Sequence, residues 1–355
     1  MISKNKIKVL VVDDSALLRQ TLSTIISSEP ELEVIGTASD PYIAVSKMKS
    51  EKPDVITLDI QMPRMDGLTF LKKIMTQHPI PVVIISSITQ KDSSIALSAF
   101  KYGAIDVIDK PEMNSALLLK EWKTKLINSI TTAAKSNISK YSLGPKIEVK
   151  SKNEDLRPAI RNNKICNSFI LIGSSAGGTE VIFKIISQLG KNTVPILIVQ
   201  HMPSIFTLSY ANRLNDYSEL TVREAVSGDE LHRGLALVAP GNMHMELKNN
   251  GFNYYVETNT NEKVNRHRPS ADVLFDSSLK FKGSNIMAII LSGMGNDGSA
   301  GMLKLKNTGA TTIAQNRESS IVYGMPKEAV KIGAADYSLS IDEIVKMINK
   351  FSKNQ

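Results

Sequence analysis

The chain has 355 residues and a formal net charge of +8, with 42% hydrophobic and 22% charged residues. These values are typical of globular proteins and exclude a disordered chain; no apolar run approaches the ~18 residues that cross a bilayer. The length predicts two domains, and the single cysteine, Cys166, excludes an internal disulfide.

The N-terminal residues predict no signal peptide. The segment MISKNKIKVL passes from a short polar stretch directly into a strand-like run. We therefore expect a cytoplasmic protein with no direct membrane insertion.

The first half of the chain alternates short apolar runs with helical patterns. Strands are predicted at 6–12, 33–38, 55–58, 81–85 and 105–108, and helices near 41–49, 67–77 and 93–102. This alternation predicts a doubly wound parallel sheet, which places its chemistry at the carboxyl ends of the strands.

Polar side chains follow these strands at their carboxyl ends. They are Asp13, Asp14, Asp59, Ser86 and Lys110. Carboxylates that lie together repel one another unless a cation joins them, and Mg²⁺ prefers oxygen ligands of this kind. A carboxylate beside the ion can accept a phosphoryl group, because the metal and a lysine neutralise the charge that develops.

The motifs LVVDDS, LDIQMPRMDG and IDKP resemble the receiver domain of bacterial response regulators, which has a flavodoxin-like fold. The resemblance implies phosphorylation at Asp59 by a chemotaxis sensor histidine kinase, Mg²⁺ bound by Asp13, Asp14 and Asp59, and a switch formed by Ser86 and Lys110. Many receivers carry an aromatic switch residue where this chain has Val107, so the relay to the second domain stays open.

The predicted receiver domain spans residues 1–128, and a basic segment follows it. Lysine and arginine outnumber acidic residues in it, among serine and asparagine, and we predict a solvated linker at 129–164 before a second domain at 165–355. The positive charge is the one feature that supports a DNA-binding output domain as an alternative. We expect no nucleic-acid partner, because the second half alternates strands with glycine-rich turns.

The second half again predicts an α/β sheet. Strands are expected at 169–174, 195–199, 235–238, 254–257, 286–291 and 311–314. Ser175, His201 and Asp297 follow three of them, and a hydroxyl, an imidazole and a carboxylate are the groups that nucleophilic acyl transfer needs. Their order along the chain differs from that of α/β-hydrolases.

The segment GSSAGG centres Ser175 in a G-x-S-x-G pattern, which favours this serine over Ser174 as the nucleophile. A phosphate cradle is the alternative for such a glycine-rich turn. The segment lacks the third glycine of a dinucleotide fingerprint and the lysine of a P-loop.

Six motifs resemble the catalytic domain of chemotaxis protein-glutamate methylesterases. They are GSSAGGTE, QHMP, SGMGNDG, APGNMHMEL, NRHRPSADVLF and AQNRESSIVYGMP. The resemblance implies a Rossmann-like domain without a cofactor, with Ser175 as nucleophile, His201 as general base, Asp297 as orienting acid and the Met294 backbone as oxyanion donor. It also implies hydrolysis of glutamate methyl esters and deamidation of glutamine on methyl-accepting chemotaxis receptors, with the unphosphorylated receiver covering the site.

The remaining histidines and two arginines are further candidates for the same site. We expect His244 and His267 to make structural hydrogen bonds or to line the site, and His78 and His232 to lie on the surface. Arginine binds carboxylates, so Arg266 and Arg268 would either hold acidic surroundings of the substrate or make structural pairs.

Overall fold

The computed structural model describes residues 6–87, 93–110, 116–138, 167–281 and 285–355, and the chain divides into two compact units, 1–143 and 144–355. Most of the predicted linker, from 139 to 164, lies outside the described residues. Among the residues that are described, no helix combines the length and apolar character needed to cross a membrane.

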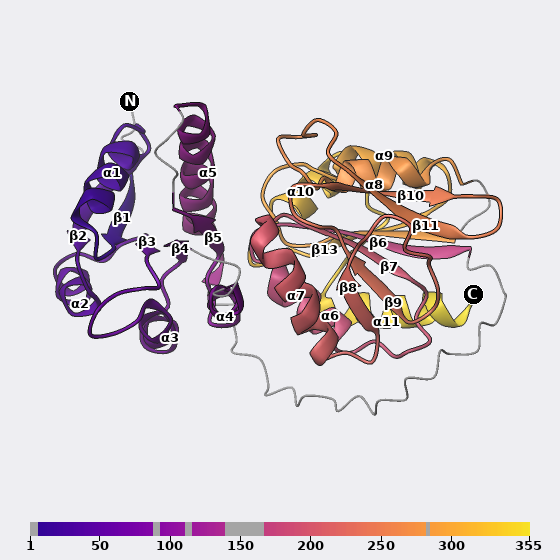
Figure 1. The fold of residues 1–355 in the computed structure, drawn as a ribbon, viewed down its shortest axis with the longest axis horizontal. Helices are drawn as coiled ribbons and strands as arrows, with labels where there is room; N and C mark the ends of the chain where they lie inside the picture. Colours follow the sequence, from indigo (N-terminus) through magenta and orange to yellow (C-terminus); the bar gives the residue numbers. More distant parts are fainter. Residues whose placement is uncertain (1–5, 88–92, 111–115, 139–166, 282–284) are drawn as a thin grey trace. The chain divides into compact units, whose positions relative to one another are not determined.

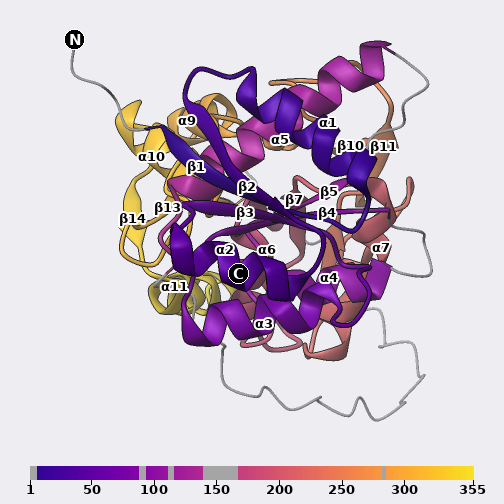
Figure 2. The same ribbon diagram turned by 90° about the vertical axis from the view of Figure 1, so that its left-hand side faces the viewer.

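The N-terminal unit is a five-stranded parallel sheet in the order β2-β1-β3-β4-β5. Its strands are β1 (Ile7–Val12), β2 (Leu32–Ala38), β3 (Val55–Leu58), β4 (Val82–Ser86) and β5 (Asp106–Asp109). Its helices are α1 (Ala16–Ser27), α2 (Pro41–Ser50), α3 (Gly67–Gln77), α4 (Ser93–Lys101) and α5 (Ala116–Ala134). Helices α1 and α5 cover one face and α2, α3 and α4 the other (Figures 1 and 2).

The C-terminal unit is a seven-stranded parallel sheet in the order β14-β13-β12-β6-β7-β9-β8. Its strands are β6 (Ser168–Ser174), β7 (Ile196–Gln200), β8 (Thr221–Glu224), β9 (Leu235–Val238), β12 (Asn285–Ile290), β13 (Thr311–Gln315) and β14 (Tyr337–Leu339). Strands β10 (His244–Asn249) and β11 (Tyr254–Asn259) form a separate antiparallel pair.

Helices cover both faces of this second sheet. They are α6 (Gly178–Ile186), α7 (Ser204–Asp216), α8 (Ala271–Ser278), α9 (Ser299–Asn307), α10 (Met325–Lys331) and α11 (Ile341–Lys353). Helices α8, α9 and α10 lie on one face, and α6, α7 and α11 on the other (Figure 1).

The predicted class of two α/β domains is therefore confirmed, and the C-terminal unit is not a compact helical DNA reader. The central strands β6 and β7 are buried along their whole length. Strands buried on both faces need continuous apolar runs, which is why the sequence pattern identified them. Strands β8, β10 and β14 were not predicted, because they are short or carry polar residues.

Helix α5 extends beyond residue 128, the predicted end of the receiver domain. Ile130 and Ala133 are fully buried in it, and the indole of Trp122 donates to the Asp109 carbonyl at 2.6 Å. The prediction assigned residues 129–134 to the basic linker, but they end an amphipathic helix in which Lys120 and Lys125 face solvent while apolar side chains pack on the sheet.

We predict that Ile130→Ala lowers the free energy of unfolding of the N-terminal unit by about 2–5 kcal/mol, because it leaves a cavity under α5. The single tryptophan, Trp122, lies in the same helix. Its fluorescence during urea denaturation therefore reports on this unit. The control is Asn128→Ala. Because Asn128 is exposed, this substitution should change the free energy of unfolding by less than about 0.5 kcal/mol. Equal effects of the two substitutions would contradict the placement of Ile130 in the core.

Candidate functional site

The first predicted site lies at the carboxyl edge of the N-terminal sheet. Asp13 follows β1, Asp59 follows β3, Ser86 ends β4 and Lys110 follows β5. Carboxylate oxygens of Asp13, Asp14 and Asp59 lie within 4.8 Å of one another. The structure thus gathers the residues that the sequence placed at strand ends.

Lys110 balances only part of this negative charge. Its Nζ lies 2.9 Å from Asp13 Oδ2 and 2.7 Å from Asp59 Oδ2. Burial lowers the pKa of Lys110, but its hydrogen bonds to Asp59 and Asp13 outweigh burial and raise it. At Asp13, burial has the larger effect and raises the carboxyl pKa despite Lys110 and the Ser15 N–H.

Three carboxylates opposed by one ammonium group leave an excess of negative charge. Asp13 and Asp59 are almost inaccessible to solvent, so water screens this charge poorly. A divalent cation with oxygen ligands removes the excess, and the donor set fits Mg²⁺.

The second site lies at the ends of three adjacent strands of the C-terminal sheet. Ser175 follows β6, His201 follows β7, and Asp297 lies between β12 and α9. The Ser175 N–H donates to the Ser292 carbonyl, and the His201 N–H donates to the Ser174 carbonyl, both at 3.0 Å. These bonds continue the sheet beyond its strands and hold Ser175 between its neighbours.

His201 and Asp297 are paired directly. His201 Nε2 lies 2.9 Å from Asp297 Oδ2. The other ring nitrogen, Nδ1, is buried and has no hydrogen-bond partner among the described residues. Within the described chain, no hydrogen bond joins Ser175 Oγ to the His201 ring. The structure therefore places Ser175 at the end of the neighbouring strand, but not in hydrogen-bond contact with the imidazole.

Asp297 is surrounded by hydrogen-bond donors. Its Oδ1 accepts from Ser270 Oγ at 2.5 Å and Asn265 Nδ2 at 2.9 Å, and its Oδ2 accepts from the Ala271 N–H at 2.7 Å. Burial raises the pKa of Asp297, but the bonds from His201, Ser270 and Asn265 outweigh it and hold the pKa well below its usual range. The carboxylate is therefore ionised, and it also caps the N-terminus of α8.

The sequence did not identify Asn265 and Ser270 as part of this site. Both lie in the NRHRPS motif ahead of α8, in which the sequence pointed only to the histidine and the arginines. Asn265 and Arg266 adopt left-handed backbone conformations, with φ of 52° and 68°. A left-handed backbone conformation is uncommon for residues other than glycine. Here it turns the side-chain amide of Asn265 toward the buried carboxylate of Asp297.

Of the other histidines, His267 packs against the predicted catalytic His201. Its ring stacks on that of His201 with centroids 3.8 Å apart and 8° between the planes. His244 is buried and its Nε2 lies 2.9 Å from the Glu262 carbonyl, which is a structural role. His78 and His232 are exposed, as predicted.

The two arginines differ. Arg268 binds Asn242 Oδ1 and the carbonyls of Thr260 and Asn261, so it holds the loop together. Arg266 is exposed beside this loop. A contact with acidic substrate surroundings therefore stays a prediction for Arg266.

The loop after β12 approaches Ser175 closely. A Cβ atom at Gly293 would lie 2.9 Å from Ser175 Cβ and 3.0 Å from its backbone nitrogen. Met294 follows directly along the chain, so its peptide group lies close to the serine. The carbonyl of Gly293 is occupied, because it accepts from the N–H groups of Gly324 and Met325.

Comparison with known proteins places both units in described families. Residues 170–348 match the CheB methylesterase family, and residues 9–121 match the response regulator receiver domain family. The chain is 47% identical over 352 residues to protein-glutamate methylesterase/protein-glutamine glutaminase 2 of Oleidesulfovibrio alaskensis. That alignment covers 97% of this chain and 98% of the relative.

A second relative is the protein-glutamate methylesterase/protein-glutamine glutaminase of group 3 operon from Rhodopseudomonas palustris. It is 45% identical over 349 residues, with 98% of this chain and 96% of the relative covered. The solved CheB methylesterase catalytic domain of Thermotoga maritima is 40% identical, with 53% of this chain and 98% of that chain covered and a TM-score of 0.49.

The low pKa of Asp297 predicts a pH-dependent contribution to stability. A carboxyl whose folded-state pKa is depressed stabilises the fold above its unfolded value of about 3.9. We expect Asp297→Asn to lower the free energy of unfolding at pH 7, and the difference from the wild type to shrink as the pH falls from about 4 to 3. Urea denaturation followed by far-ultraviolet circular dichroism measures it.

Asp276→Asn is the matched control. Asp276 is half-buried and pairs with the exposed Lys304, so its loss should change stability by at most about 1 kcal/mol at any pH. A difference between wild type and Asp297→Asn that stays constant down to pH 3 would refute the depressed pKa.

Proposed function

The chain belongs to the CheB methylesterase family and carries a response regulator receiver domain, and we propose that phosphorylation of Asp59 controls its hydrolysis of glutamate methyl esters on chemotaxis receptors. It is a protein-glutamate methylesterase and protein-glutamine glutaminase that serves chemotactic adaptation. The observation that carries the catalytic proposal is the His201–Asp297 pair at 2.9 Å, one strand away from Ser175.

Ser175 is the proposed nucleophile. Its Oγ attacks the carbonyl carbon of the methyl ester while Nδ1 of His201, the ring nitrogen without a partner among the described residues, takes the hydroxyl proton. The tetrahedral intermediate expels the methoxy group, which leaves as methanol with the proton from His201. Water, deprotonated in turn by His201, then cleaves the acyl–serine bond and releases glutamate. With a glutamine side chain the same steps release ammonia.

Asp297 is the proposed orienting acid. Because its charge is held by Ser270, Asn265 and the Ala271 N–H, it fixes the His201 ring and stabilises the imidazolium that forms when the proton is taken. The backbone N–H of Met294 is the proposed oxyanion donor, supported by the close packing of Gly293 on Ser175.

The receiver pocket is the proposed control site. Asp59 accepts the phosphoryl group from a chemotaxis sensor histidine kinase. Asp13, Asp14 and Asp59 would hold Mg²⁺, and the ion would supply positive charge beside that group. Lys110 pairs with Oδ2 of Asp13 and of Asp59, and Ser86 at the end of β4 is the proposed switch hydroxyl. The proposed domain boundaries stay as predicted, except that α5 continues to Ala134.

Ser175→Ala should abolish methanol release from methylated receptor, because no other group proposed for the site forms the acyl–enzyme bond. Phosphorylation of Asp59 should be intact. The matched control is Ser174→Ala, since Ser174 is fully buried and its Oγ donates to the Ser292 carbonyl, where the Ser175 N–H also donates. A Ser174→Ala chain that is inactive beside an active Ser175→Ala chain would reverse the assignment.

Asp59→Asn should remove the stimulation of methanol release by a small-molecule phosphodonor with Mg²⁺, because the amide cannot accept a phosphoryl group. Asp54→Asn, an exposed acid that accepts from the Lys8 N–H, is the control and should be stimulated like the wild type. Removing Mg²⁺ with a chelator should have the effect of Asp59→Asn. Stimulation that survives both changes would contradict the control site.

A further inference from the structure

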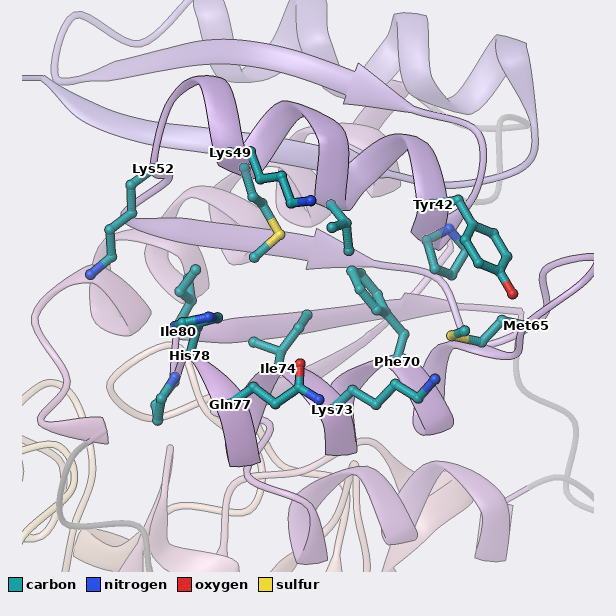
Figure 3. A pocket seen from close by; sticks show the side chains of 14 residues that line it. Tyr42, Lys49, Lys52, Met65, Phe70, Lys73, Ile74, Gln77, His78 and Ile80 are labelled. Carbon is teal, nitrogen blue, oxygen red and sulfur yellow. The ribbon is translucent and has the colours of Figure 1, made fainter.

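The receiver unit contains a groove that phosphorylation chemistry does not use. It lies between α2 and α3 and has a volume of about 870 Å³ (Figure 3). Its lining residues are Pro41, Tyr42, Val45, Met48, Lys49, Lys52, Met65, Phe70, Lys73, Ile74, Gln77, His78, Pro79 and Ile80.

The floor of this α2–α3 groove is apolar. Phe70, Ile74 and Ile80 form it and are nearly buried. Apolar side chains also stand at the rim, where Tyr42 is 57% and Val45 40% exposed. Covering such surface stabilises a complex by roughly 25 cal/mol per Å² of apolar area.

The rim is positively charged on both sides. Lys49 stands on the α2 wall and Lys73 on the α3 wall, while Lys52 lies at the end of the groove opposite Tyr42 (Figure 3). In the part of the chain that the structure describes, none of these three lysines forms an ion pair.

The acidic residues nearby are already engaged. Glu51 pairs with Lys8, and Asp40 pairs with Arg64 while it caps α2. Asp66 caps α3 through the Thr69 N–H, and its bonds keep its pKa low although burial opposes them. The groove therefore keeps a positive rim over an apolar floor, a combination complementary to an acidic segment that also presents apolar side chains.

We propose that the α2–α3 groove is a docking site for an acidic, partly apolar segment of a partner protein. The segment places one or two aliphatic or aromatic side chains on Phe70, Ile74 and Ile80, and its carboxylates face Lys49, Lys52 and Lys73. An apolar anchor surrounded by charges is the usual way in which a peptide segment binds a groove.

Two other occupants fit less well. A nucleic acid would bind through its phosphates and leave the apolar floor uncovered. An anionic bilayer would meet the lysines but not side chains at the bottom of a groove, since binding to a membrane surface relies on apolar side chains that project outward.

A displayed library of random twelve-residue peptides tests this proposal. The library is selected on the full-length chain and counter-selected on a Lys49→Glu, Lys73→Glu chain. Enriched peptides should combine Asp or Glu with aromatic or aliphatic residues. Synthetic copies should bind the wild type by fluorescence anisotropy, more weakly as salt is raised, and lose about tenfold or more in affinity on the double variant and on Tyr42→Ala.

Lys72→Glu is the matched control, because Lys72 is the neighbour of Lys73 on α3 but lies against the Tyr102 ring, outside the groove. Affinity should be unchanged on this variant. The proposal is overturned if no peptide is enriched, if Lys72→Glu weakens binding as much as the double variant does, or if acidic peptides bind the double variant as well as wild type. It is also overturned if duplex DNA or phosphatidylserine vesicles, but no peptide, require Lys49 and Lys73.

Discussion

The buried charge of Asp297 is the constraint on which the catalytic unit depends. An ionised carboxylate deprived of water is costly unless hydrogen bonds replace its hydration. Here Ser270, Asn265 and the first N–H of α8 replace it, and His201 completes the set. One carboxylate thereby ties the end of β7, the loop before α8 and the loop after β12 to a common point.

In the receiver pocket, by contrast, the buried negative charge is not fully compensated. Asp13 and Asp59 share one lysine, and the pKa of Asp13 is raised because burial is not fully offset. A site whose charges are satisfied internally holds a fixed geometry, whereas a site with surplus charge gains stability by binding a cation. The difference fits the proposed roles of the two sites, an orienting carboxylate on one sheet and a metal and phosphoryl pocket on the other.

The sequence predicted what local patterns encode. Continuous apolar runs located β6, β7 and β12, and strand ends located Ser175, His201 and Asp297, because carboxyl ends of parallel strands share one edge. Asn265 and Ser270 were out of reach. Their role depends on an irregular loop with left-handed residues that brings them to a carboxylate far along the chain. The stacking of His267 on His201 likewise joins separate loops, which no periodicity encodes. Helix α5 was not predicted, for another reason: composition averages over both faces of a helix, so the basic and polar residues of this region concealed the apolar face to which Ile130 and Ala133 belong.

The origin of these contacts limits how a receiver can control the catalytic unit. Asn265, Ser270 and Ala271, which donate to Asp297, all belong to the C-terminal unit, as does His201. Because the His201–Asp297 pair and these donors lie in one unit, we propose that phosphorylation of Asp59 acts on access to Ser175 or on its side chain rather than on this pair. A tenfold change in rate needs only about 1.4 kcal/mol, which is within ordinary coupling energies. Val107 is buried and has no hydroxyl to exchange hydrogen-bond partners, so Ser86 and Lys110, at the ends of β4 and β5, stay the proposed switch residues.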